Sequence, residues 1–409
     1  MMRKKLLLFI FLGGSISLNA QNINDNKFSF QYTQLPLIKI DDRLSNYEVR
    51  IEHTYAAANE DSTAQYNAKK EAQKNTYEMM LARYQFVRDS LDRDYLKRLS
   101  AWEISVNNGA TGPNGTQLAQ PNPPIYPEPP YLYPIEAPFL HSNLDDNAAK
   151  GQINIEGYNQ GLGGYIVSIK VHPVQFMPVQ MEKKGSGATT KYEYKLPYIL
   201  PVSIKIESPT QGTLIDENLF QTVKYYNLPD QKSMYENELY MMDNKMTVYQ
   251  TVEATARSQA FAQVNSYLND QVGYPVKNRY IELYSVKKYK DYEYSDVTNA
   301  YTEAMQALGL VKNSRDWSSA RTKIDKAIAS IDKILQESNV NDNKARINDK
   351  VTAMLQCNKA ELLIWKADFD AADMEINLIL NSGEGKAKRY IQGEQGFYAD
   401  LKKRYKANY

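Results

Sequence analysis

The sequence predicts an α+β multidomain protein: an antiparallel β-sandwich with an inserted long helix/polyproline hairpin, then a mixed α/β region and a C-terminal helical domain. Three patterns carry this prediction. Between residues 28 and 206 several segments alternate apolar and polar side chains, as strands do. From 77 to 102 apolar side chains recur every three or four positions, which indicates a helix. After residue 290 helical spacing prevails.

The first strands illustrate the alternation. Residues 28–40 (FSFQYTQLPLIKI) and 47–55 (YEVRIEHTY) both have the composition of strands. Further alternating runs follow at 165–173 and 192–209, separated by glycine-containing turns. We therefore expect residues 21–225 to form one sandwich, interrupted by an excursion at 57–140.

The excursion joins a helix to a proline-rich segment. A helix at about 62–105 would be roughly 65 Å long, and residues 113–138 would span about 80 Å as polyproline II. Because the two lengths are comparable, the proline segment is expected to run back along the helix as a hairpin. Six side chains are predicted to pack between the limbs: Tyr77, Met80, Tyr84, Tyr126, Tyr131 and Tyr133.

The arrangement resembles the helix-against-polyproline hairpin of the pancreatic-polypeptide fold, in architecture only. Two other interpretations of the proline run stay open: a ligand for another protein's groove or a plain spacer. Beyond the sandwich, residues 226–290 are expected to form a mixed connecting region, with a helix at about 253–268 and a strand at 279–288.

The last region, 291–409, contains a repeated pattern. An aspartate and an aromatic residue precede an alanine three positions after the aromatic, as in Asp316-Trp317 with Ala320 and Asp368-Phe369 with Ala372. A small residue lets two helices cross closely, and the aromatic seals the turn between them.

This pattern resembles the tetratricopeptide repeat, and Ala360 matches the small residue expected on the preceding helix. The two copies are 52 residues apart (Ala320 to Ala372) rather than the roughly 34 of tandem repeats. The resemblance implies a stack of helical hairpins that pack through Trp317, Ala320, Ala360, Phe369 and Ala372.

The first twenty residues have the features of a secretory signal. Arg3, Lys4 and Lys5 precede the apolar run 6–12, and a small residue, Ala20, ends the segment. The signal and the tyrosine- and asparagine-rich composition resemble precursors of the Gram-negative envelope. This implies a periplasmic or outer-membrane-associated location, or the cell surface, and no later run is long enough to span a membrane.

Net charge excludes a general nucleic-acid binder. The chain carries +1 formally, and −2 once the three cations of the signal are subtracted. A local exception is 386–406, which holds seven Lys or Arg residues. This run is interpreted as the solvated face of a helix, with docking to an acidic surface as the alternative.

No set of residues predicts catalysis. The three histidines (His53, His141 and His172) stand in separate segments without metal-ligand spacing, and no G-x-S-x-G motif occurs. The single cysteine, Cys357, is interpreted as a small buried side chain. We expect no catalytic, metal or cofactor site, and the sequence does not favour a small-molecule ligand.

These observations predict a non-enzymatic exported envelope protein, acting as a protein-binding scaffold or an accessory subunit of an outer-membrane-associated secretion or assembly complex. Its partners would be other envelope proteins. One alternative is a surface adhesin that binds carbohydrate through tyrosine-rich strands. Another is a hydrolase of envelope polymers, which would need His172 or His53 beside a serine or carboxylates in a pocket.

Overall fold

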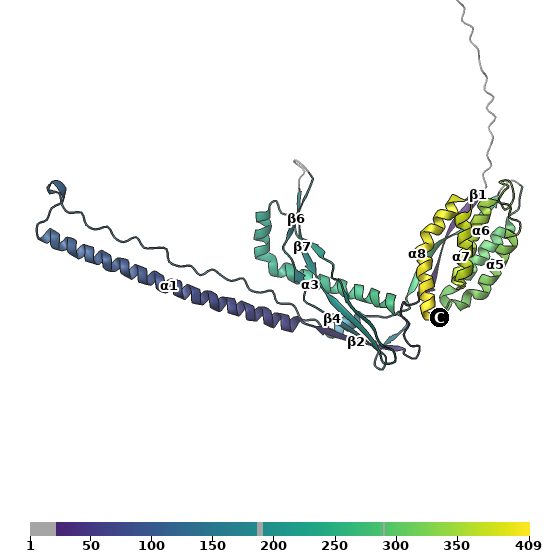
Figure 1. Ribbon diagram of the computed structural model, residues 1–409, viewed down its shortest axis with the longest axis horizontal. Coiled ribbons are helices and arrows are strands. Elements are labelled where there is room, and N and C mark those ends of the chain that lie inside the picture. The colour runs from purple at the N-terminus through teal and green to yellow at the C-terminus, as the bar shows by residue number, and fades with distance from the viewer. Residues whose placement is uncertain (1–21, 186–190, 289–290) are drawn as a thin grey trace, which may run out of the picture.

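The computed structural model describes residues 22–185, 191–288 and 291–409 (Figure 1). The signal peptide expected at residues 1–20 lies outside this described part. The expected mixture of helices and strands is confirmed, in two hydrophobic cores and one projecting arm. No helix in the described part is long and apolar enough to cross a membrane.

The first core contains two open sheets and a long helix, α3 (Met234–Gln271). The larger sheet has the order β3-β2-β4-β8-β9, formed by Asn159–Gln160, Asn46–His53, Tyr165–Val171, Val202–Ser208 and Gly212–Leu219. The smaller sheet has the order β10-β7-β5 with β6 also on β7, formed by Lys224–Asn227, Lys191–Ile199, Gln175–Phe176 and Gln180–Lys184. Alternate residues of β4 and β8 are buried, as the alternation predicted.

The larger sheet is mixed, so the expectation of a purely antiparallel arrangement is wrong. β2 pairs with β4 in parallel, Tyr47 opposite Tyr165 and His53 opposite Val171. The cause is the arm: the chain leaves at the end of β2 and returns to the same place. It must then cross back to the start of β2 before β4 can begin, so β4 runs in the same direction.

The crossing segment, 146–160, is irregular at residues 152–158. Ile153 and Ile155 are buried, but only α2 (Asp146–Gly151) and the short β3 are regular here. α3 is much longer than the helix expected at 253–268. Its N-cap Ser233 accepts a hydrogen bond from Glu236 N, and its first half exposes apolar side chains, so no amphipathic pattern marked it.

The second core is built from a two-stranded sheet and five helices. The strands are β1 (Asn22–Thr33) and β11 (Val276–Lys288), and the helices are α4 (Ser295–Leu308), α5 (Arg321–Leu335), α6 (Asp349–Trp365), α7 (Phe369–Asn381) and α8 (Gly385–Asn408). Two short turns of 3-10 helix, Val311–Asn313 and Ser318–Ala320, connect α4 to α5.

β1 was expected in the sandwich, and this placement is wrong. The strand pairs along its length with β11, Phe28 opposite Ile281 and Thr33 opposite Val276. Its aromatic residues pack on the helices instead: the rings of Phe30 and Tyr32 lie 5.2 and 4.9 Å from that of Trp365. The region 226–290 is likewise divided, since α3 belongs to the first core and β11 to the second.

The five residues expected to pack the helical repeat are all buried: Trp317, Ala320, Ala360, Phe369 and Ala372. Trp317 contacts Trp365 edge to face at 5.0 Å, and its Nε1 donates to Thr33 O. Trp317 has φ +59°, so it reverses the chain just before α5 begins. The segment 336–348 between the copies is a loop, closed by a bridge between Ser338 and Ile347.

α8 connects the two cores. The Arg404 guanidinium, 5 % exposed, donates to Leu35 O at 3.0 Å and to Asp270 O at 2.9 Å, and it pairs with the Asp270 carboxylate at 2.7 Å. Asn408 Nδ2 donates to Pro36 O at 2.8 Å. Asp270 lies at the end of α3, so this joint fixes the helical domain against the first core.

The arm projects from the first core (Figure 1). Its helix, α1, spans Tyr55–Asn107, which corresponds to about 80 Å. It ends two residues beyond the expected end at about 105, and Gly109 follows at φ +75°. After a short turn at Pro113–Gly115, the chain returns beside α1 as an irregular extended segment, 116–140, which we call the return segment.

Candidate interaction site

The return segment is hydrogen-bonded to α1 at several points and runs antiparallel to the helix. Trp102 Nε1 donates to Leu118 O at 3.1 Å, and Gln73 Nε2 donates to Tyr133 O at 2.8 Å. Between them Tyr126 donates its hydroxyl to the Asp92 carboxylate. Because side chains of α1 bind backbone carbonyls that have no other partner in a proline-rich chain, the hairpin needs no strand pairing.

Prolines make most of the contact on the return segment. Its half-buried members recur mainly at intervals of three: Leu118, Pro121, Pro124, Pro130, Ile135 and Pro138. Three residues make one turn of polyproline II, so one edge of the segment faces α1. The matching stripe on α1 is also half-buried and includes Tyr66, Tyr77, Tyr84, Leu91, Tyr95 and Trp102.

Of the six side chains expected to pack between the limbs, some are half-buried and the others are exposed. Tyr77 and Tyr84 lie on the half-buried stripe, whereas Met80 is 46 % exposed. Tyr126, Tyr131 and Tyr133 are all exposed. Tyr131 and Tyr133 contact each other edge to face at 4.9 Å, and Arg88 lies over the Tyr126 ring. The period of three places the prolines on the half-buried edge, and the three tyrosines lie beside that edge, where Tyr126 still contacts Asp92 and Arg88 of α1.

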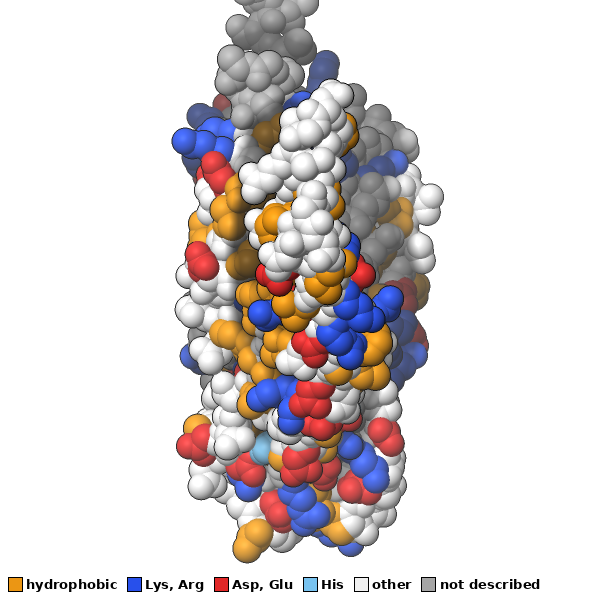
Figure 2. Space-filling model, turned by 90° about the vertical axis from the view of Figure 1, so that its left-hand side faces the viewer, with side chains coloured by type: hydrophobic (Ala, Val, Ile, Leu, Met, Phe, Trp, Pro, Cys, Tyr) orange, Lys and Arg blue, Asp and Glu red, His pale blue; other side chains and the backbone are white. Residues whose placement is uncertain are grey.

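The outer face of the arm, opposite the return segment, exposes large apolar side chains. Phe86 follows Met79 by seven residues and Ile104 follows Phe86 by eighteen, which are about two and five helical turns. All three are more than 60 % exposed. Arg83, Arg93 and Lys97 fall on the same face and form no ion pair within the described part of the chain. Figure 2, in which the tip of the arm faces the viewer, shows apolar and charged side chains interleaved.

The root of the arm is a buried polar cluster. Glu253 of α3, 1 % exposed, accepts hydrogen bonds from His141 Nδ1 at 2.7 Å and from Ser142 N at 3.1 Å, and it forms an ion pair with Arg257 at 2.9 Å. Asn59 of α1 binds both backbone groups of His141. One carboxylate and one amide thus join the return segment to α3 and α1.

Arg257 extends the cluster to the start of α1. Its Nε donates to the Tyr55 hydroxyl at 3.1 Å, its Nη2 donates to Ser142 O, and its guanidinium lies 4.1 Å from the Tyr55 ring centroid. The rings of His53 and His141 both stack with that of Tyr55, at centroid distances of 5.2 and 5.7 Å. We call Tyr55, His141, Glu253 and Arg257 the root cluster.

Electrostatics favours the ionised form of Glu253. Burial opposes ionisation, but the hydrogen bonds from His141 and Ser142 and the charge of Arg257 outweigh it, so the pKa of Glu253 falls below its ordinary value. The pKa of Tyr55 is raised, chiefly by burial. The root cluster therefore contains a charged carboxylate whose partners all come from segments that must meet for the arm to attach.

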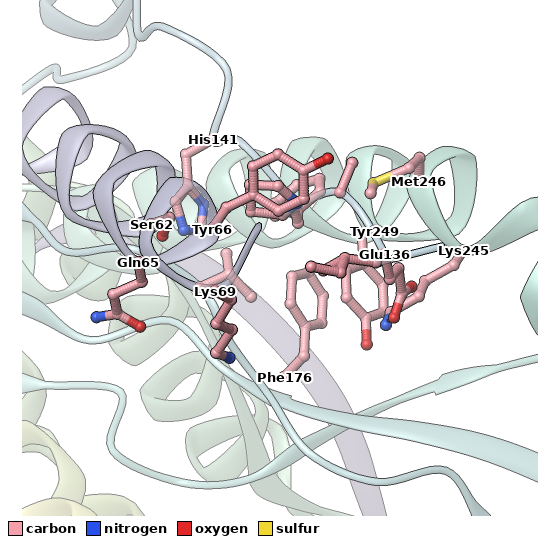
Figure 3. A pocket seen from close by; sticks show the side chains of 15 residues that line it. Ser62, Gln65, Tyr66, Lys69, Glu136, His141, Phe176, Lys245, Met246 and Tyr249 are labelled. Carbon is pink, nitrogen blue, oxygen red and sulfur yellow. Dashed lines mark hydrogen bonds and ion pairs between the residues drawn. The ribbon is translucent and has the colours of Figure 1, made fainter. Parts of the chain in front are cut away.

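A cleft of about 570 Å³ opens beside the root cluster. Figure 3 shows α1 contributing Ser62, Gln65, Tyr66 and Lys69, with Phe176 of β5 and Tyr249 of α3 facing them. Phe176 and Tyr249 stack at 3.9 Å, and Phe139 contacts both edge to face. Ser62 and His141 line the same cleft without a hydrogen bond between them. The hydrogen bonds from His141 and Ser142 and the ion pair with Arg257 hold Glu253 beside this cleft.

The histidines expected to matter for a hydrolase lie elsewhere. His172 Nε2 is 3.0 Å from Ser203 Oγ, but Ser203 donates its only proton to Asn218 Oδ1 at 2.6 Å. With the serine proton directed to Asn218, the geometry favours donation by the ring to the serine oxygen. His53 lies 3.7 Å from the Asp146 carboxylate. Cys357 is buried, and burial raises its pKa, which disfavours a thiolate.

Three of the seven cations in the basic run at 386–406 form ion pairs within the described part of the chain. Lys386 pairs with Asp25 at 2.7 Å, Lys402 pairs with Asp373 at 2.6 Å, and Arg404 is the joint described above. Among the tyrosines of the strands, Tyr47, Tyr165, Tyr194 and Tyr198 are buried, whereas Tyr225 of β10 and Tyr280 of β11 are exposed.

The root cluster was missed from the sequence. Its one local signal is the Glu253–Arg257 pair at i,i+4 on a helix, a spacing that most often marks a solvated face. His141 and Tyr55 meet that pair from segments more than a hundred residues away, which no local pattern reveals. Comparison of the chain with protein-family models, curated proteins and solved structures finds no match.

Proposed function

We propose that the protein is a non-enzymatic scaffold of the Gram-negative envelope, which binds partner proteins through its arm as an accessory subunit of an outer-membrane-associated secretion or assembly complex. The observation that carries the proposal is the outer face of α1. It presents Met79, Phe86 and Ile104 to solvent in one line, although large apolar groups are costly to leave exposed. Contact with a partner would remove them from water.

The root cluster supports this role mechanically. A projecting arm can hold a bound partner in a defined position only if its base is fixed. The buried Glu253 and Arg257 bind both limbs at that base. The helical pairs α4–α5 and α6–α7, packed through Trp317 and Phe369, are proposed as tetratricopeptide-like units that form a second contact surface. The basic residues on the arm's outer face favour a partner surface that combines apolar and acidic groups.

The test is capture from detergent-extracted native envelopes with three forms of the full chain. The first is wild type, and the second carries Met79→Ser, Phe86→Ser and Ile104→Ser. The third is a matched control with Gln85→Ser, Asp89→Ser and Glu103→Ser, all exposed on another side of α1. Circular dichroism of the three forms checks that α1 is retained.

Wild type and control should recover the same partners, and the apolar variant should lose at least about tenfold of them, because each buried apolar side chain contributes roughly 1.5–3 kcal/mol. If wild type is recovered without any partner, or if all three forms capture the same amount of partner, the basis of the proposal is removed. Export is tested separately, by locating the chain in fractionated cells.

A further inference from the structure

A second hollow of about 730 Å³ lies on the other side of the arm's root. It lies between the return segment, the chain that leads into β6, and the first turns of α3. We call it the methionine groove and define it by Met234, Met241, Met242, Pro178, Val179 and Asn237. Its volume is in the range of pockets that bind ligands.

The groove is apolar and adaptable. Met242 is 79 % exposed and Met234 is 41 % exposed, at the end of a long helix whose remaining length is covered by the first core. Methionine side chains are unbranched and polarisable, so they fit apolar partners of different shapes. This composition indicates an occupant with aliphatic or aromatic side chains.

One polar atom of the groove lacks a partner. Asn237 is 2 % exposed, and its Oδ1 is buried without a hydrogen bond from any residue that the structure describes. A buried acceptor left unpaired costs about 1–3 kcal/mol, so an N–H or O–H donor from an occupant would be stabilising. An alkyl chain offers no such donor, whereas a peptide backbone offers one at nearly every residue.

The neighbouring strand favours an extended peptide. A helix uses its own N–H groups internally, but an extended segment keeps them free for Asn237 and for a strand edge. β6 begins directly after Val179 and pairs only with β7 among the described strands. Its other edge therefore presents unpaired backbone groups beside the groove.

Charge adds a further requirement. Two carboxylates, Glu136 and Glu238, line the groove with a single cation, Lys245. Glu136 pairs with Lys245 at 2.7 Å, and Glu238 forms no ion pair within the described part of the chain. The rim thus carries one uncompensated negative charge, which favours an occupant with a basic residue near its apolar ones.

We infer that the methionine groove binds an extended, apolar segment of a partner protein that carries a lysine or arginine. The segment places its apolar side chains among the methionines and donates a backbone N–H to Asn237 Oδ1. The inference rests on the proposed scaffold function and names the class of partner segment. It uses a surface separate from the outer face of α1.

The test is selection of phage-displayed short random peptides on the full chain, followed by affinity measurement with the enriched peptides. Enriched sequences should combine apolar residues with Lys or Arg. Met242→Glu should weaken their binding at least about tenfold, because a charge then replaces an apolar contact. Tyr235→Glu, exposed on the same helix but outside the groove, should leave binding unchanged. Asn237→Leu should weaken it less than Met242→Glu does.

Absence of enrichment, or equal binding to Met242→Glu and wild type, overturns the inference. Binding of a spin-labelled fatty acid that Met242→Glu abolishes, with no peptide selected, overturns it in favour of an alkyl chain. The outer-face variant of α1 should bind the peptides normally. If no peptide binds while envelope capture still depends on the outer face of α1, only the inference about the methionine groove is rejected. If peptides bind but envelope capture does not depend on the outer face, only the proposed function of the arm is rejected.

Discussion

Two helices of this protein, α1 and α6, are stabilised in opposite ways. Thirteen of the seventeen residues of α6 are buried, including Trp365 and Glu361, whereas Tyr55 alone is buried among the fifty-three residues of α1. α6 is a helix because its surroundings enclose it. α1 depends on its own backbone ladder, on good helix formers and on a thin cover of prolines.

The comparison teaches that length and burial have separate functions here. A short enclosed helix fixes the core of a domain, and a long uncovered one extends reach. Substitutions that remove packing should therefore affect α6, and substitutions that break the backbone ladder should affect α1.

The largest effect is expected from Trp365→Ala. The side chain is fully buried and its Nε1 donates to Glu361 at 2.8 Å, so its removal should lower the free energy of unfolding of the helical domain by about 3–5 kcal/mol. Denaturant titration followed by circular dichroism measures the change. Met80→Ala on α1 is the comparison and should stay within about 0.5 kcal/mol. Similar losses for both would contradict the contrast between the helices.

The second test breaks the ladder of α1 at an exposed position. Ser90→Pro removes a backbone donor and clashes with the preceding turn, at a cost of about 3 kcal/mol to the helix. The arm should bend or fray there, and the maximum dimension from X-ray scattering should shorten. Ser90→Ala keeps the ladder and should scatter as wild type does. An unchanged dimension in Ser90→Pro would show that the return segment alone supports the arm.

The third test addresses the root cluster through pH. Because the folded pKa of Glu253 is below its ordinary value of 4.5, its contribution is complete above that value and is lost as the pH falls through the folded pKa. Hydrogen exchange at 55–59 and 139–142 should accelerate in acid before α6 exchanges. Glu253→Gln should lack this step and start about 3 kcal/mol less protected. An acid step that persists in Glu253→Gln would assign it to another group.

The smallest effect concerns the cover of α1. Pro121→Ala and Pro124→Ala together should loosen the return segment by about 1 kcal/mol, since each relaxes a preset backbone and reduces contact. Faster proteolysis between Leu118 and Tyr126 reports the loss. Ile125→Ala, at a site 93 % exposed, should leave the cleavage rate unchanged. If Ile125→Ala had the larger effect, the inward direction of the prolines would be wrong.

The sequence predicted the parts of the fold that local periodicity determines. The alternation in β4 and β8, the end of α1 at Gly109 and the buried aromatics Trp317 and Phe369 all follow from spacing within a few residues. It also placed the proline segment back along α1, because two comparable lengths leave few ways to close the chain.

Partners distant in sequence could not be predicted in the same way. By its own alternation β1 could join a sheet of the first core or pair with β11 in the second. The aromatic contacts of Phe30 and Tyr32 with Trp365 place it in the second core. The methionine groove and the root cluster also form from three segments each. On the return segment the prolines are half-buried while Tyr126, Tyr131 and Tyr133 are exposed, because the three-residue turn of polyproline II decides which side chains form the covered edge.

The pairing of β1 with β11 has a consequence for how the chain is made. Phe28 lies opposite Ile281, 253 residues later (281 − 28). At about 5–20 residues per second, the ribosome takes roughly 13–50 s to supply that partner. During this interval an aromatic strand near the start of the chain has no neighbour, and such strands aggregate readily. A holding chaperone that covers Phe28, Phe30 and Tyr32 would bridge the delay.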